Sequence, residues 1–448
     1  MRWMLLLKSL IIGFLSLVLL IPLMMVLGLV EARNTRQRQV RENVAASAAG
    51  RQQLTGPLLV ATYRERVTTD EKDERTGQAV QRVKWVSRAM PVVPKDLLLR
   101  GEAKVEERHR GLYKAQIFHL NGTLSGTVVM PAGLGLPFGS PTFEPGRLQL
   151  LVGLSDLRGI RNRPVAVWDG AKHEFQPGSV CDVLPSGIHA DLGPLENGPR
   201  REVAFEVPLE LTGSEDLSIA PVAENTQVTL RSDWTSPSFA GRFLPVKHTI
   251  TDQGFEATWQ VFALARDLGA ILRRNGSAPA EECFSVAFLE PVNVYLQSER
   301  AVKYGFLFVA LTFGAFFLFE LLKGLKIHPV QYFLVGLALA MFFLLLISLS
   351  EHIAFIPAYL ASAAACILLI GSYLVHALKS FARGLGFSGG LTLLYAALYG
   401  LLASEDNALL LGAALLFLAL GVVMMATRKI DWYGLTNPQL DTDTSPAP

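Results

Sequence analysis

The sequence is poor in the residues and patterns that carry most enzyme chemistry. Three cysteines occur among 448 residues, and none stands in a Cys-x-x-Cys pair. There is no Gly-Lys dipeptide, which excludes a P-loop, and His173-Glu174 is followed by Phe-Gln-Pro instead of a second histidine at helical spacing. These absences argue against phosphate-binding loops, thioredoxin-type redox pairs and the common zinc motifs. The sequence predicts no catalytic residue, no cofactor and no metal site.

Charge is nearly missing from two parts of the chain. Residues 9–30 contain no Asp, Glu, Lys or Arg, and residues 302–427 contain few. Residues 31–300, in contrast, hold 32 Lys or Arg and 32 Asp or Glu, so their net charge is zero. Because nucleic-acid binders need a basic excess to neutralise phosphates, nucleic acid is excluded as a partner.

Apolar runs of about 20 residues are long enough to span a bilayer as a helix. The first run, Leu10 to Val30, is longer than a signal-peptide core and is not followed by a small-residue cleavage site, which predicts an uncleaved anchor. Five later runs predict a C-terminal helical block; they are 303–322, 330–349, 353–376, 387–403 and 407–427. The bilayer is therefore the first predicted partner.

The short loops predict the direction of insertion. One side carries all of their basic residues, namely Arg2, Lys8, Lys323, Lys326, Lys379, Arg383, Arg428 and Lys429. The other side carries Glu351, His352, Glu405 and Asp406. The positive-inside rule then places both termini in the cytoplasm and residues 31–300 outside it. Arg33, Arg36, Arg38 and Arg41 oppose this orientation, but the rule is weak for a long translocated domain.

The long central segment reads as a β-rich domain. Strand-type segments recur between turn signals, and alternation is clearest from Glu202 to Val207. A sandwich-like domain with one short helix over 261–273 is predicted, and Asn121-Gly122 is predicted to interrupt a strand. The expected division is a transmembrane anchor at 1–30, a helical stalk at 31–50, the β-rich domain at 51–300, a five-helix block at 301–430 and a tail at 431–448.

Two groups of residues are candidates for binding. Trp234, Phe239, Arg242 and Phe243 combine aromatics with arginine in a Pro- and Ser-rich segment, which suits recognition of a sugar or peptide and equally suits a loop folded onto the core. Asp156 and Arg158 lie at a predicted turn and fit either a ligand contact or an Asp-anchored structural ion pair.

Other polar residues leave their roles open. His109 and His119 fit a metal site only if one strand ran unbroken between them, and solvated histidines are the alternative. Glu351, His352, Glu405 and Asp406 fit either a cation or proton site or plain helix-end polarity. Cys181 and Cys283 fit either an oxidised pair or two buried thiols.

Within the apolar runs, ionisable residues are nearly absent. Glu320 is placed near a helix end, where its side chain would reach the interface. Small residues, Gly336, Ala340, Gly386 and Gly389, are predicted to support close helix packing. This inventory argues against solute translocation, which requires polar groups at mid-membrane depth.

The chain resembles the CreD family of bacterial inner-membrane proteins. The resemblance is carried by residues 106–119, 155–160, 216–260, 299–352 and 428–435. It implies the inner membrane of a Gram-negative cell and a link to a two-component regulon that responds to envelope stress. It implies no catalytic residues.

Together these features predict a non-enzymatic protein of envelope integrity and stress response. Its periplasmic β domain is expected to bind an envelope protein or a cell-wall component, while the helical block anchors the chain and supports an oligomer. Two alternatives stay open: a transporter accessory or small-molecule carrier, and a periplasmic hydrolase.

Overall fold

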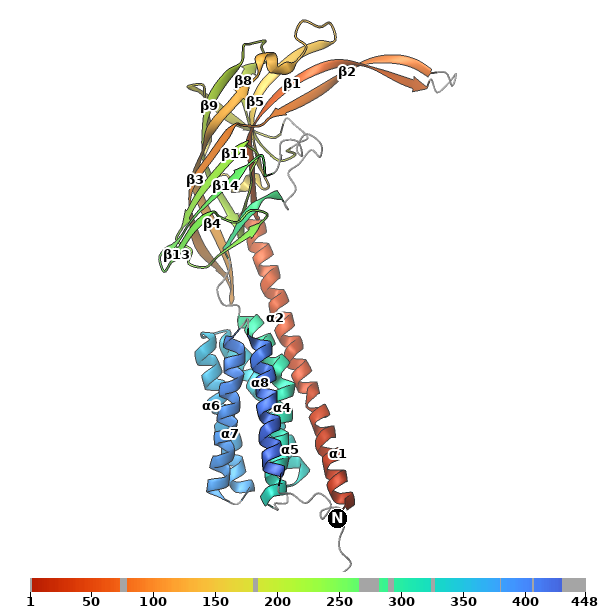
Figure 1. Cartoon of the computed structure of the whole chain (residues 1–448), viewed down its shortest axis with the longest axis vertical. Helices are drawn as coiled ribbons and strands as arrows, with labels where there is room; N and C mark the ends of the chain where they lie inside the picture. The colour runs from red at the N-terminus through yellow and green to blue at the C-terminus, as the bar shows by residue number, and fades with distance from the viewer. Residues whose placement is uncertain are drawn as a thin grey trace, which may run out of the picture. The chain divides into compact units, whose positions relative to one another are not determined.

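The computed structural model describes residues 2–72, 79–179, 184–265, 282–288, 294–323, 327–378, 380–404 and 407–428. The chain divides into two compact units, a helical unit of residues 1–37 with 292–448 and a β unit of residues 38–291. Figure 1 shows the helices and strands of each unit. The N-terminal apolar helix, the β-rich middle and the five-helix block confirm the predicted fold class.

The helical unit is built from long apolar helices. Within the described residues, six segments are long and apolar enough to cross a membrane, the first being Leu10–Ala45. The helices are α1 (Arg2–Val18), α2 (Leu20–Ser47), α4 (Val294–Lys323), α5 (Pro329–Ser350), α6 (Phe355–Ala377), α7 (Phe381–Ala403) and α8 (Ala408–Thr427). The helix predicted to follow the anchor is the continuation of α2 to Ser47.

Small residues support helix packing at some of the predicted positions. A Cβ on Gly336 of α5 would clash with Leu19 and Phe313, so its absence lets these side chains approach the α5 backbone. Ala340 is also buried. Gly386 and Gly389 face open space, so the prediction of close packing at these two positions is wrong.

The described residues of the β unit form fifteen strands, which are arranged as two joined sheets. The first holds β12-β15-β10-β1-β5-β8-β7, with β2 paired to β1, and the second continues as β6-β9-β4-β3-β11-β14-β13. Strand β7 pairs with β8 in the first sheet and with β6 in the second. Buried residues of both sheets form one hydrophobic core, as in a sandwich.

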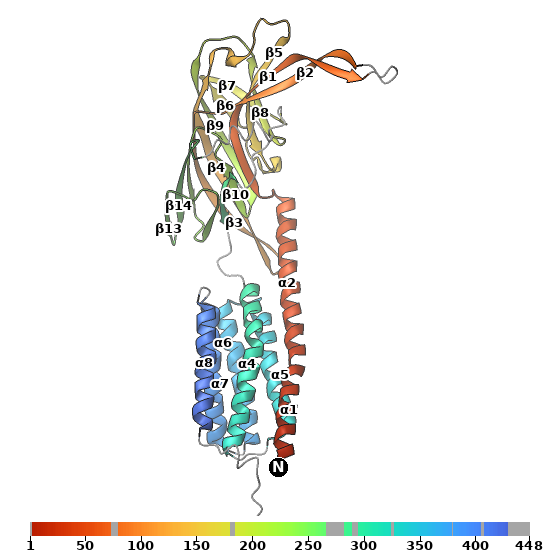
Figure 2. The same cartoon turned by 45° about the vertical axis from the view of Figure 1, so that its right-hand side comes forward.

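The strands have the following bounds. They are β1 (Gln52–Lys72), β2 (Ala79–Val92), β3 (Asp96–Arg110), β4 (Tyr113–Met130), β5 (Phe143–Leu154), β6 (Val165–Trp168), β7 (Ala171–Pro177), β8 (Gly187–Pro194), β9 (Arg201–Ser214), β10 (Asp216–Ala220), β11 (Asn225–Ser232), β12 (Pro237–Gly241), β13 (Lys247–Thr251), β14 (Gly254–Phe262) and β15 (Phe284–Phe288). Figure 2 labels β6, β7 and β9 together on one side of the unit.

The alternation that predicted a strand at 202–207 is confirmed in β9. Val203, Phe205 and Val207 are buried in the core, whereas Glu202 and Glu206 are exposed. A period of two is what a strand with one buried face requires.

Two local predictions are wrong. Asn121 and Gly122 lie inside β4, opposite Glu102 and Gly101 of β3, and the hairpin turns at residues 111–112 instead. Pairing with strands on both sides of β4 outweighs the local turn preference of this dipeptide. The helix predicted from Val261 does not start there, because Val261 pairs with Thr226 in a ladder between β14 and β11. The rest of that segment, from residue 266, lies outside the described residues.

Candidate functional site

The β unit contains a cavity of about 700 Å³ near the junction of its two sheets. Its walls come from the end of β4, the short 3-10 turn η1 (Ala132–Gly135), β5, the β6–β7 hairpin and the segment that joins β8 to β9. The hydrogen bond from the Gly133 amide to the Gly198 carbonyl, 2.9 Å long, links two of these walls. None of the candidate binding residues predicted from the sequence lines this cavity.

The β6–β7 hairpin sets one wall through its turn. Asp169 and Gly170 have φ values of 51° and 80°, which a two-residue type I′ turn requires. The turn brings Trp168 opposite Ala171 at the end of the ladder. Trp168 is 4% exposed and packs in the core, and it lines the cavity together with Asp169 and Ala171.

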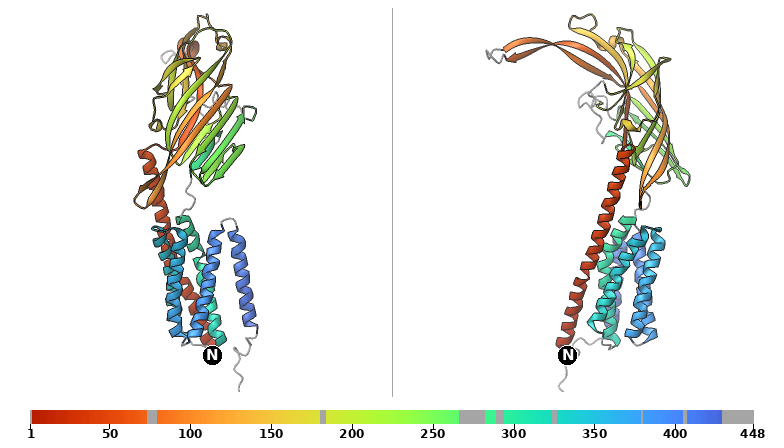
Figure 3. Two further views of the ribbon diagram at one scale, coloured as in Figure 1. Left: turned by 90° about the vertical axis from the view of Figure 1, so that its left-hand side faces the viewer. Right: turned by 180° about the vertical axis from the view of Figure 1, so that it is seen from behind.

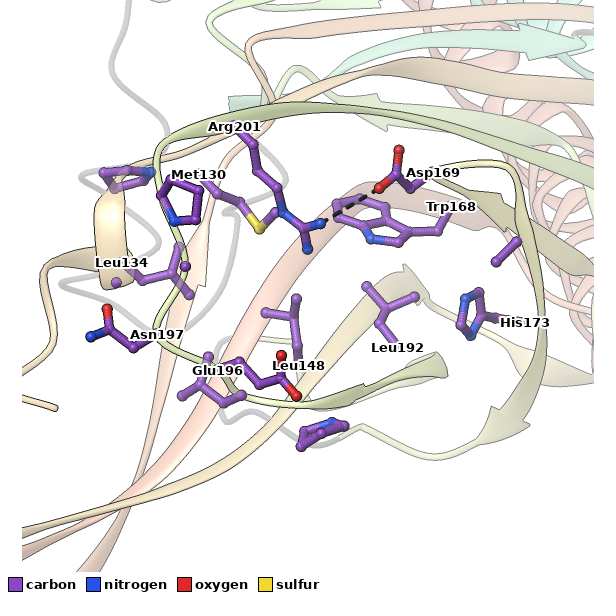
Figure 4. A pocket seen from close by; sticks show the side chains of 17 residues that line it. Met130, Leu134, Leu148, Trp168, Asp169, His173, Leu192, Glu196, Asn197 and Arg201 are labelled. Carbon is purple, nitrogen blue, oxygen red and sulfur yellow. Dashed lines mark ion pairs between the residues drawn. The ribbon is translucent and has the colours of Figure 1, made fainter. Parts of the chain in front are cut away.

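The cavity has an apolar floor and a polar rim (Figure 4). The floor is formed by Met130, Leu134, Leu148, Trp168, Leu192 and Leu195. The rim is formed by Asp169, His173, Glu196, Asn197 and Arg201. An apolar surface with a few convergent polar groups is typical of small-molecule sites.

The rim charges are partly paired. Arg201 Nη1 lies 3.5 Å from Asp169 Oδ2, and both side chains are more than half exposed. His173 Nδ1 donates to the carbonyl of Asp191 over 2.8 Å, which leaves Nε2 as the ring nitrogen that this contact does not use. The Arg147 guanidinium hydrogen-bonds Asp191 and holds the pKa of that carboxyl below its usual range. These contacts position the end of β8 beside the cavity.

The predicted aromatic cluster lies elsewhere and packs against the core. Phe239, in β12, meets Phe255 and Trp259 edge-on at 5.7 Å and 5.6 Å between ring centroids. Trp234 is half-buried and donates from Nε1 to the Ser236 carbonyl over 3.1 Å.

The neighbouring residues of that cluster are also placed by the core. Phe243 packs against the hydrophobic core, and the exposed Arg242 side chain lies 3.8 Å from the Glu282 carboxylate. A binding role for Trp234, Phe239, Arg242 and Phe243 stays a prediction.

Asp156 and Arg158 form an ion pair. For this turn the sequence had left open either a ligand contact or such a structural ion pair. Asp156 Oδ2 accepts from Arg158 Nη2 over 2.6 Å and from the Gly50 amide over 3.1 Å, and Oδ1 accepts from the Arg158 amide over 3.0 Å. The Arg158 guanidinium lowers the pKa of Asp156 to about 2. One carboxylate thus ties the N-terminal end of β1 to the turn after β5. A ligand contact at this pair also stays a prediction.

The two histidines do not meet. His109 lies opposite Lys114 near the β3–β4 turn, whereas His119 lies in β4 and hydrogen-bonds Thr212 Oγ1 through Nδ1 at 2.9 Å. Among the described residues, no group of three or more His, Cys, Asp or Glu side chains is arranged to hold a metal ion.

Cys283 is buried beside β15, and burial raises the pKa of its thiol to about 12. Cys181 lies outside the described residues, so pairing of the two stays a prediction.

The polar residues of the helical unit have structural partners. Glu320 is 8% exposed and accepts from the Tyr332 hydroxyl over 2.8 Å and from the Ile327 amide over 3.2 Å. It therefore fastens α4 to α5, and the expectation that its side chain reaches the interface is wrong. Buried between helices, the carboxylate gains two hydrogen bonds that a side chain extended toward the interface would lack.

The loop acid Glu351 is partnered as well. It accepts from Tyr295 Oη over 3.3 Å and lies 3.4 Å from Arg33 Nε. Glu405 and Asp406, predicted to lie near it, are outside the described residues.

One sequence pattern resembles a hydrolase motif without its geometry. Gly386 to Gly390 reads Gly-Phe-Ser-Gly-Gly, but the whole segment lies inside α7. Ser388 Oγ donates to the Gly384 carbonyl over 3.0 Å, whereas a nucleophilic serine of this motif stands on a turn between a strand and a helix.

Known proteins similar to this chain agree on one family. The model of the family described as "Inner membrane protein CreD" matches residues 4–433. Inner membrane protein CreD of Escherichia coli (strain K12) is 34% identical over 427 residues, covering 95% of this chain and 93% of that protein.

Similarity to solved structures is weak. A crystal structure of the M1 zinc metallopeptidase from Deinococcus radiodurans matches with a TM-score of 0.23 and 11% identity, covering 44% of this chain and 42% of that one. A mutant of the same enzyme gives a TM-score of 0.22 and 13% identity over the same shares of the chains. Such scores do not establish a shared fold. The match of the family model to nearly the whole sequence does establish a relationship: this chain belongs to the CreD family of inner membrane proteins.

Proposed function

We propose that this inner-membrane protein maintains envelope integrity under stress by binding a cell-wall component in the β unit. The proposal places the β unit in the periplasm and both termini in the cytoplasm. Its support for that orientation is the confinement of the short-loop basic residues to one side of the predicted spans. The link to an envelope-stress regulon rests on the family resemblance.

The cavity near the junction of the two sheets is the observation that carries the binding proposal. Its volume of about 700 Å³ lies within the range of small-molecule sites. A cell-wall fragment joins sugar rings, which have apolar faces, to peptides that carry carboxylates and amines. The apolar floor suits the rings, and the rim offers Arg201 to a carboxylate and Glu196 to an amine.

The lining favours binding over hydrolysis. None of the described residues around the cavity is Ser, Thr, Cys, Lys or Tyr, so covalent catalysis would have only carboxylates or His173 to use. Asp169 is in addition engaged by Arg201. We therefore treat the chain as a binding protein, with the helical unit as its anchor and as the surface for an oligomer.

A steric variant tests the site without disturbing the core. Ala171 is exposed and lines the cavity, whereas Lys172 is its exposed neighbour on the same strand and does not. Successive side chains of a strand point to opposite faces, so Ala171→Trp fills the cavity and Lys172→Trp is a matched control.

The measurement is calorimetric binding of soluble muropeptides to the full-length chain in lipid nanodiscs. Ala171→Trp should weaken binding at least tenfold, while Lys172→Trp should bind as the wild type does. Equal binding by both variants would remove the cavity from the proposal. Turnover of the muropeptides would favour the hydrolase alternative, and binding of a transported solute in their place would favour the carrier.

A further inference from the structure

The hairpin of β1 and β2 extends beyond the sheet to which it belongs. The two strands pair from Leu59 opposite Val92 to Lys72 opposite Ala79. Strand β5 accompanies β1 only as far as Glu65 opposite Phe143. Past that point the hairpin is a two-stranded ribbon, seen as the projecting orange pair in Figures 1 and 3. A ribbon of two strands has no core of its own and is marginal in water, so contact with another surface would stabilise it.

One face of the β1–β2 hairpin, at the base of this ribbon, combines arginines with exposed apolar side chains. Arg66 lies directly opposite Trp85, and Arg64, two residues earlier on the same face, has its guanidinium carbon 5.7 Å from the Trp85 ring centroid. Val83 lies on this face next to Trp85 and is 48% exposed, while Trp85 is 38% exposed. We call Arg64, Arg66, Val83 and Trp85 the arginine–tryptophan face.

The positive charge of this face is only partly neutralised. Arg64 forms an ion pair with Glu144 at 3.2 Å, and both side chains are about half exposed. Arg66 makes no ion pair with any described residue. On the opposite face, Arg88 is neutralised by Glu65 at 2.7 Å. Arg66 therefore leaves positive charge on the arginine–tryptophan face that a negatively charged partner would neutralise.

The strand edges are unsuited to pairing with another strand. Among the described residues β2 pairs only with β1, and its sequence contains Arg82, Lys84 and Arg88, with Pro91 near its end. In a second copy paired antiparallel, these like charges would face one another, which is destabilising. Basic residues and proline at an edge are a common protection against such pairing. The ribbon is accordingly built to make contact through a face.

We infer that the arginine–tryptophan face docks on the headgroups of an anionic lipid bilayer. Tryptophan and arginine suit this boundary, because the indole ring prefers the interface and the guanidinium forms paired hydrogen bonds with phosphate. Val83 adds apolar area beside them. This contact is separate from the cavity and does not depend on the function proposed for it.

Vesicle flotation tests the contact with the full-length chain. The chain is held in zwitterionic nanodiscs, and vesicles of phosphatidylcholine with or without phosphatidylglycerol are offered separately. We expect co-flotation only with the anionic vesicles. Each of Arg64→Gln and Arg66→Gln should weaken it about fivefold, as expected for one basic residue at an anionic surface. Trp85→Ala should weaken vesicle binding more than either arginine variant does, whereas Trp85→Phe should retain most of the binding.

Arg88→Gln is the matched control, because it removes the same charge from the other face of the same hairpin. It should leave vesicle binding unchanged, as should Ala171→Trp in the cavity. If Arg88→Gln and Arg66→Gln lost equal amounts of vesicle binding, the binding would depend on net charge alone, and the inference would be overturned. It would be overturned equally by binding to pure phosphatidylcholine, by a soluble anionic polymer bound as tightly as the vesicles, or by ribbon-dependent pairing of two chains.

Discussion

At the scale of single residues, Asp156 shows how one carboxylate joins distant parts of the chain. It accepts hydrogen bonds from the Gly50 amide and from both the amide and the guanidinium of Arg158. The contact between Gly50 and Asp156 closes a long loop, so its loss should loosen the start of β1 rather than only the turn that holds Asp156.

We predict that Asp156→Ala raises hydrogen exchange at the Gly50 amide at least tenfold near neutral pH, consistent with a loss of roughly 1.5–3 kcal/mol for hydrogen bonds to a charged group. The folded pKa of about 2 is below the unfolded value, so the stabilisation is complete above about pH 5 and is lost as the pH falls toward 2. Exchange measured by mass spectrometry on the full chain tests this. Asp252→Asn, at an exposed turn, is the control. Unchanged exchange at Gly50 would contradict the assignment.

The sequence pattern around Asp156 indicated a polar turn, but it left a ligand contact and an ion pair equally open. The choice depends on Gly50, which lies 106 residues away in sequence. The same holds for Trp234 and Phe239, whose residue types suit either a binding loop or a core. Strand pairing sets the packing of Phe239 on Phe255 and Trp259, and Trp234 packs against the same core. Local composition does not contain such contacts.

At the scale of elements, the connection between α4 and α5 depends on a buried carboxylate. Glu320, near the end of α4, accepts from Tyr332 on α5 and from the Ile327 amide just before it. Removing one partner leaves a buried polar group unsatisfied, which costs about 1–3 kcal/mol.

We therefore predict that Glu320→Ala lowers the midpoint of thermal unfolding of the chain in detergent, and that Tyr332→Phe lowers it less. Because the two residues share one interaction, the double variant should lose little more than Glu320→Ala alone. Fluorescence-detected gel filtration after heating measures this. Ser372→Ala, which removes an exposed hydroxyl bonded only within α6, is the control. Additive losses would show that the two residues do not act together.

The elements themselves were largely predictable, whereas the cavity was not. Apolar runs indicated the spanning helices, and alternation indicated β9, because both patterns are local. The cavity combines segments from residue 130 to residue 201, which strand pairing brings together, including β4 with β9, β5 with β8, β6 with β9 and β7 with β8. A partial signal was present, since Asp169-Gly170 between Trp168 and Ala171 is a strong hairpin pattern.

At the scale of the whole molecule, the direction of insertion into the membrane decides which compartment contains the β unit. We predict that a periplasm-active reporter fused after Gly139 is active and that one fused after Gly324 is silent. The eight basic residues of the short loops on one side are the physical reason, because moving them across the membrane is unfavourable. A cytoplasm-active reporter at the same positions should give the opposite pattern. The reverse outcome for both reporters would overturn the orientation.

The central claim is that the cavity of the β unit meets a cell-wall component in the living envelope. Photo-crosslinking tests it most directly, with a photoreactive residue in place of Glu196 on the exposed rim and, as a control, in place of Asp252 on a distant exposed turn. Mass spectrometry of the purified full chain should find cell-wall saccharide or peptide attached at position 196 and not at position 252. Equal labelling at both positions, or adducts at position 196 that contain only cytoplasmic molecules, would contradict the account.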